Sequence, residues 1–93
     1  MKLSITTKKT NSLTSGAPKI LATAGKRQKT VNYDLSKSSD WNHGQAAGAL
    51  LLSVDEKDDS NLSSQFVVGL HEGTVDHQVS DGGGKHSFTL FTA

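Results

Sequence analysis

The sequence predicts an α+β protein, with a small antiparallel or mixed sheet of about five to six strands and one covering helix. Alternation of apolar and polar residues near both ends of the chain is typical of strands that bury one face. Between these ends, one segment carries apolar residues at helical spacing. With 93 residues, the chain is expected to form a single domain that spans residues 1–93.

The first part of the chain is expected to form strands. Leu3 and Ile5 alternate with polar residues, and Val31 and Tyr33 do the same further on. Gly25 permits a turn between two such segments, and a stretch rich in turn-forming residues ends at the only proline. The expected elements are a strand at 2–8, a loop at 10–18 and strands at 19–24 and 29–35, the last two being separate or one long bent strand.

A helix is expected from about residue 40 to residue 54. Ser38, Ser39 and Asp40 offer side-chain oxygens that can accept hydrogen bonds from the free amides of a first helical turn. Apolar residues then recur at i, i+3, i+4 and i+7, so they share one stripe that should pack on the sheet. The residues of this stripe are Ala47, Leu50, Leu51 and Val54.

The last part of the chain is expected to return to strands after an exposed acidic loop. The apolar run around Phe66 is rich in residues that favour strands, and it predicts a largely buried strand. Asp81 followed by three glycines suits a hairpin that needs positive φ. The expected elements are a loop at 55–61, strands at 65–71 and 75–79, a hairpin turn at 81–84 and a strand at 86–91.

The two halves of the chain carry opposite charge, which indicates charged binding partners. Eight of the ten Lys and Arg residues precede position 41, and seven of the nine Asp and Glu residues follow it. Clustered cations can neutralise phosphates whatever the base sequence, although a short basic run is also typical of a solvated turn or a protected edge strand. The residues expected to bind nucleic acid or an acidic partner are Lys8, Lys9, Lys19, Lys26, Arg27 and Lys29.

A second set of residues is expected to form a protein interface. Trp41, the only tryptophan, either seals one end of the core or serves as an exposed anchor for a partner. The acidic residues that join it in the expected interface are Asp55, Glu56, Asp58 and Asp59. Gly44 and Gly48 would let another backbone approach the helix closely, most simply the sheet on which it packs.

No metal, cofactor or catalytic residue is expected. The chain has no cysteine, which excludes thiolate zinc sites and a cysteine nucleophile. His71, His77 and His86 would approach one another if their strands were neighbours, but their spacing and that of His43 match no metal motif. No nucleophile or phosphate-loop motif is complete, so the protein is expected not to be an enzyme.

The preferred function is that of a small binding protein whose basic half docks on nucleic acid or on a complex that handles nucleic acid. The size, the lack of cysteine and the many Ser and Thr residues are typical of an accessory protein of a phage or mobile element. The alternative is an oligomeric protein–protein interaction module, a virion component or an inhibitor of a host complex, which associates through complementary charged surfaces. Without an apolar leader or a membrane-spanning stretch, a cytoplasmic protein without membrane contact is expected.

Overall fold

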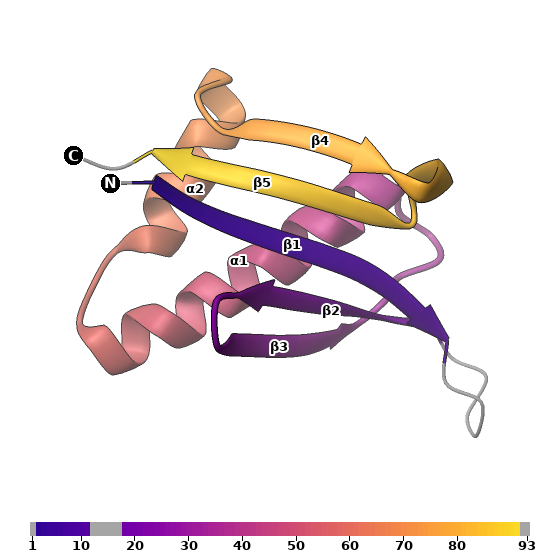
Figure 1. Cartoon of the computed structure of the whole chain (residues 1–93), viewed down its shortest axis with the longest axis horizontal. Coiled ribbons are helices and arrows are strands. Elements are labelled where there is room, and N and C mark those ends of the chain that lie inside the picture. Colours follow the sequence, from indigo (N-terminus) through magenta and orange to yellow (C-terminus); the bar gives the residue numbers. More distant parts are fainter. Residues whose placement is uncertain (1, 12–17, 92–93) are drawn as a thin grey trace.

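The computed structural model describes residues 2–11 and 18–91, and within them it contains a five-stranded antiparallel sheet and two helices (Figure 1). The strands are β1 (Lys2–Asn11), β2 (Pro18–Ala24), β3 (Arg27–Asn32), β4 (Asp76–Ser80) and β5 (Lys85–Phe91), and the helices are α1 (Ser39–Asp58) and α2 (Leu62–Glu72). The α+β class and the antiparallel sheet are confirmed. The expected loop at 10–18 is partly absorbed by β1 and β2, and its centre at 12–17 lies outside the described residues.

The sheet has the order β3-β2-β1-β5-β4, and every neighbouring pair of strands is antiparallel. β1 lies in the middle because it pairs with β2, which follows it directly, and with β5, which ends the described chain. This second pairing places Lys2 opposite Phe91 and Thr7 opposite His86. The first and the last strand of the described chain therefore lie side by side in the interior of the sheet (Figure 1).

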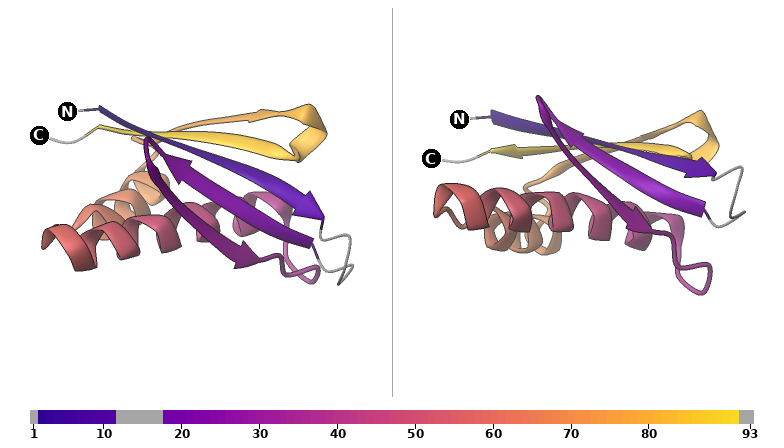
Figure 2. Two further views of the ribbon diagram at one scale, coloured as in Figure 1. Left: turned by 60° about the horizontal axis from the view of Figure 1, so that its bottom comes forward. Right: turned by 90° about the horizontal axis from the view of Figure 1, so that it is seen from below.

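Both helices cover the same face of the sheet, and the opposite face is left uncovered in the described part of the chain (Figure 2). In β1, Ile5 and Thr7 are buried under the helices, while Ser4 and Lys8, which flank them in the strand, are exposed. Since side chains alternate across a strand and directly paired residues share a face, the register assigns every strand residue to one of the two faces.

Helix α1 confirms the expected helix and extends it at its C-terminal end. Its N-cap is Ser38, whose Oγ accepts a hydrogen bond from the Trp41 amide at 3.1 Å. Leu50 and Leu51 are buried against the sheet, as the helical stripe predicted. The helix continues through the acidic residues up to Asp58 and ends at Asp59 with φ of 52°. Most of the loop expected at 55–61 is thus helical.

The strand expected at 65–71 is wrong, because this segment is helix α2, a second covering helix that packs beside α1. A short continuous apolar run does not distinguish a strand from a helix, and the β-rich composition favoured the strand. Phe66 and Gly69 are buried and Leu62 is half-buried, and these positions are spaced i, i+4 and i+7. Phe66 meets Phe88 of β5 edge to face, with ring centroids 5.3 Å apart.

Candidate functional site

The uncovered face of the sheet is polar and basic. Lys8 of β1 is paired directly with Lys85 of β5, and Lys19 of β2 is paired with Thr10, two residues from Lys8 on the same face. Among the strand residues that the structure describes, Asp76 is the one carboxylate on this face. The uncharged polar residues around the lysines are Ser4, Thr6, Thr10, Thr23, Gln28, Thr30, Asn32, Gln78, Ser80, Ser87 and Thr89.

Protection of a sheet edge does not explain these lysines. Lys8, Lys19 and Lys85 lie on β1, β2 and β5, which are the three interior strands of the sheet. Like charges placed directly opposite each other on a sheet are destabilising, and the Lys8–Lys85 pair is of this kind. A bound anion would offset that repulsion. We refer to Lys8, Lys19 and Lys85 as the lysine cluster.

Sequence reasoning found two members of the lysine cluster and missed the third. Lys8 and Lys19 were among the expected binding residues, whereas Lys85 lies in the acidic half of the chain, far from any run of basic residues. Lys9, which was also expected to bind, points to the opposite face, where its Nζ lies 4.5 Å from the centroid of the Tyr33 ring.

The other three expected basic residues form a separate group at an edge of the sheet. Lys26 lies in the turn between β2 and β3, and Arg27 and Lys29 lie on the edge strand β3. Arg27 is already engaged, because its Nη2 donates to Asp58 Oδ2 at 2.9 Å. Lys29 is paired with Ala22, a buried residue, so it shares the helix-covered face. The six expected residues thus do not form one surface.

The expected protein-interface residues are also divided by the fold. Asp55 is half-buried and binds within the protein: its carboxylate accepts from the backbone amides of Leu62 and Ser63 and from the hydroxyls of Ser60 and Ser63. Glu56 and Asp59 are exposed near the end of α1. Trp41 does not seal the core, since 43% of it is exposed on the first turn of α1.

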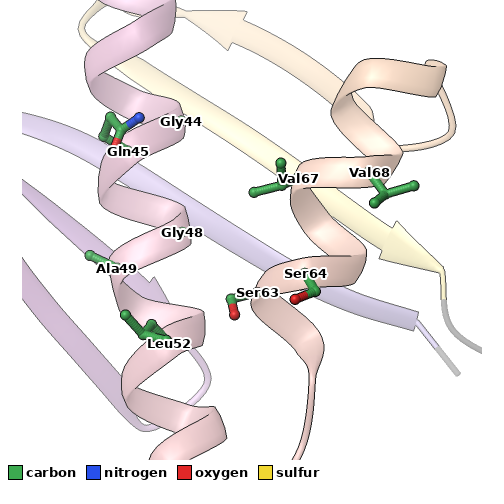
Figure 3. A pocket seen from close by; sticks show the side chains of 9 residues that line it. All are labelled: Gly44, Gln45, Gly48, Ala49, Leu52, Ser63, Ser64, Val67 and Val68. Carbon is green, nitrogen blue, oxygen red and sulfur yellow. The ribbon is translucent and has the colours of Figure 1, made fainter.

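An apolar groove runs between the two helices (Figure 3). It has a volume of about 570 Å³, and its walls include Leu52 of α1 and Val67 of α2, which are 54% and 61% exposed. Gly44 and Gly48 line this groove and do not pack on the sheet. The small residues of α1 therefore open a groove toward α2, which the sequence did not predict.

Histidines gather under the sheet where the first turn of α1 meets β4 and β5. The rings of His43 and His86 are both buried and stacked, with centroids 3.7 Å apart. Thr7 Oγ1 lies 2.6 Å from His43 Nδ1, and the exposed His77 places its Nε2 2.7 Å from His86 Nδ1. Asp40 Oδ1 lies 3.8 Å from the same His86 nitrogen. From the sequence, His71 was the residue considered as a neighbour of His77 and His86. In the fold, the neighbours of these two histidines are His43 and Asp40.

Burial keeps the two inner histidines neutral. Desolvation, together with repulsion from His86 and His77, lowers the pKa of His43 to about 4. Desolvation, followed by repulsion from His77, also lowers the pKa of His86. Among the described residues, His43 Nε2 is a buried atom without a hydrogen-bond partner. The rings of His43 and His86 are therefore neutral near pH 7, and each keeps one ring nitrogen with a lone pair.

A serine triad is not assembled here, although Ser39 approaches His86. Ser39 Oγ lies 3.3 Å from His86 Nε2, but it donates to the Gly83 carbonyl at 3.0 Å. The same carbonyl lies 3.2 Å from His86 Nε2, and since a carbonyl only accepts, this nitrogen carries the hydrogen. It is then unable to act as the base for Ser39.

No family model matches the chain, and comparison with curated proteins and with solved structures found no significant match. Within residues 2–11 and 18–91, neither helix is long and apolar enough to cross a membrane.

Proposed function

We propose that the protein is a non-enzymatic nucleic-acid-binding protein that holds backbone phosphates on the uncovered face of its sheet. The observation that carries this proposal is the lysine cluster, because three cations lie beside one another on interior strands without a carboxylate paired to any of them. Lysine ammonium groups neutralise phosphates and release counterions from nucleic acid. The hydroxyl and amide side chains around them are further donors that protein–DNA interfaces use toward phosphate and sugar.

The distribution of charge between the layers directs a polyanion to one side of the molecule. The segment from Ser39 to Glu72, which forms the helical layer, holds six of the nine carboxylates and one of the ten basic residues. The strand register places the lysine cluster on the opposite face of the sheet, which no helix of the described chain covers (Figure 2). A polyanion is therefore attracted to the sheet face and repelled by the helices.

The affinity for nucleic acid is expected to depend on contacts with the sugar-phosphate backbone and not on the base sequence. The single aromatic residue of the uncovered face in the described strands is Phe91, which is 57% exposed and lies at the end of β5. One aromatic side chain at the rim provides little stacking for successive bases. Contacts to phosphate then supply most of the affinity, which should fall steeply with salt.

Fluorescence anisotropy of labelled duplex and single-stranded DNA across a salt series tests the proposal. Replacing Lys8, Lys19 and Lys85 together by Ala should weaken binding similarly for all sequences and lower the salt slope by about 0.9 for each duplex phosphate that the variant no longer neutralises. The fold should survive, because the change removes a like-charge pair from the sheet.

The matched control is the triple variant Lys26→Ala, Arg27→Ala, Lys29→Ala, which removes the same charge from the edge group. It should retain most of the affinity. An equal loss in both triple variants would mean that only net charge matters and would refute the assignment to the sheet face. Failure of the unmodified protein to bind at low salt would refute nucleic-acid binding altogether, since electrostatic attraction is strongest there.

Self-association is the second candidate function, and the opposite charges of the two layers favour it. The acidic helical layer of one copy would face the basic sheet of the next, a head-to-tail contact that forms rings or filaments. Light scattering on the same samples distinguishes the candidates. The lysine-cluster variant should lower the mass of the particles if the copies pair in this way, and leave it unchanged if the lysines serve nucleic acid.

A further inference from the structure

We propose that Asp40, His77 and His86 form a binding site for a divalent transition-metal ion, with Zn²⁺ as the best match. One ligand atom from each of these residues lies within 4.8 Å of the others. The residues come from three elements, the first turn of α1 and the strands β4 and β5. The protein was expected to hold no metal because the spacing of its histidines in the sequence matches no metal motif. The fold brings together an aspartate and two histidines that lie outside any such motif.

The hydrogen bonding of His86 presents a lone pair to the site. Its Nε2 carries the hydrogen that the Gly83 carbonyl accepts at 3.2 Å, so Nδ1 is the unprotonated nitrogen. This Nδ1 is the atom that faces both His77 and Asp40. Histidines that bind metals commonly donate their other ring hydrogen to a backbone carbonyl, which holds the ring and its tautomer in place.

Packing fixes the orientation of the His86 ring further. One side of the ring stacks on His43, whose own Nδ1 is held by Thr7 Oγ1 at 2.6 Å. Ser39 Oγ donates to the same Gly83 carbonyl at 3.0 Å and so holds the acceptor as well. A ligand fixed in this way loses little side-chain entropy when a metal binds.

A small movement of His77 completes the geometry. Its Nε2 and His86 Nδ1 are 2.7 Å apart, which is a hydrogen-bond distance. Two nitrogens bound to a tetrahedral Zn²⁺ at about 2.0–2.1 Å each are about 3.3 Å apart. His77 is exposed, and its ring stacks on Phe88 with centroids 4.4 Å apart, so it can slide along that ring away from His86, with its hydrogen moved to Nδ1. Asp40 is exposed and can turn toward the ion. The metal would take the place of the hydrogen shared between the two rings.

The ligand set favours zinc and its neighbours over magnesium and calcium. Two imidazole nitrogens and one carboxylate suit Zn²⁺, Co²⁺, Ni²⁺ or Cu²⁺, whereas Mg²⁺ and Ca²⁺ prefer oxygen ligands throughout. Three protein ligands leave a fourth position of a tetrahedral ion to solvent. Because Asp40 and His77 are exposed, this position opens to the surface.

Isothermal titration calorimetry of the full chain without a histidine tag, stripped of metal by EDTA, tests the proposal. Zn²⁺ should bind with one equivalent and raise the melting temperature, while Mg²⁺ and Ca²⁺ should give no saturable heat. Co²⁺ should reproduce the stoichiometry and give a visible absorption band. The His77→Ala and Asp40→Asn variants change exposed residues and should each weaken Zn²⁺ binding by about 10- to 100-fold or more.

Each variant has a matched control. His71→Ala removes another exposed histidine, and Asp76→Asn removes the carboxylate that precedes His77 but lies on the opposite face of the sheet. Both controls should bind Zn²⁺ as the unmodified protein does. The proposal is overturned if the unmodified protein gives no saturable Zn²⁺ binding, or if the controls lose as much affinity as His77→Ala and Asp40→Asn. The readout is independent of nucleic acid, so its outcome does not depend on the proposed function.

Discussion

Asp55 connects the two helices, and its removal should destabilise the protein although the residue lies near the surface. Asn61, the N-cap of α2, makes no capping hydrogen bond with its side chain. Asp55, near the end of α1, supplies the cap instead by accepting from the amides of Leu62 at 2.7 Å and Ser63 at 3.0 Å. Hydroxyls of Ser60 and Ser63 donate to the same carboxylate at 2.6 Å each. Asp55→Ala removes all four bonds.

The expected loss is about 1 to 2 kcal/mol at neutral pH. Burial by itself raises the pKa of Asp55, but the hydrogen bonds from Ser60, Ser63 and Leu62 outweigh it and lower the pKa from 3.8 to about 2. A difference of this size corresponds to about 2.5 kcal/mol, which solvent reduces to about 1 to 2 kcal/mol because the side chain is only half-buried. The loss of a helix cap costs a comparable amount, and the two contributions overlap.

The effect has a defined pH dependence. Because the folded state holds Asp55 at the lower pKa, the unfolded state binds more protons between the two values. The contribution of Asp55 is fully present above about pH 4 and is lost as the pH falls from 3.8 toward 2. Asp55→Asn should remove this part of the acid sensitivity.

Urea denaturation followed by circular dichroism at pH 7 and at several values between 4 and 2 measures both quantities. Glu56→Ala is the matched control, since Glu56 is an exposed acidic residue on the same turn of α1. It should leave the free energy of unfolding nearly unchanged. Asp55 does not cap α2 in the way described if Asp55→Ala unfolds at the same urea concentration as the unmodified protein at pH 7, or if Asp55→Asn keeps the full slope of stability against pH below 4.

Three further predictions concern the core and the helices. Leu50→Ala should lower the free energy of unfolding by about 2–5 kcal/mol, and an unchanged denaturation midpoint would contradict its burial. Gly69→Ala should destabilise the protein by about 1–3 kcal/mol, because the new Cβ would lie 2.6 Å from Val75 Cγ2. In Gly48→Ala the new Cβ would have no atom within 4 Å, so this variant should be more stable by up to about 1 kcal/mol. In EDTA, the free energy of unfolding should fall by up to about 3 kcal/mol as the pH drops from 6.5 to 4. The reason is that His43, with a pKa of about 4, stays largely neutral in the folded state over this range but is protonated in the unfolded state. Equal stability at both pH values would count against the burial of His43 as a neutral ring.

Elements whose residue pattern has a clear period were predicted well. The stripe around Leu50 located α1, and the alternation around Ile5 located β1. The segment of α2 was misassigned because its apolar residues are consecutive, so no period separates the two structures. What favours the helix there is tertiary: Phe66 packs on Phe88, and the first turn is capped by a carboxylate from another helix.

The sequence by itself determined the α+β class, the helical stripe of α1 and the basic character of the first three strands, because these depend on residues close together in the chain. Only the tertiary structure decided which charged and metal-binding groups share a site. Pairing of β1 with β5 brings Lys85 beside Lys8 and His86 beside Thr7, and the packing of α1 under these strands adds Asp40. Strand pairing across nearly the whole chain depends on which faces bury the most apolar surface together, and this is a property of the complete fold that no local pattern contains.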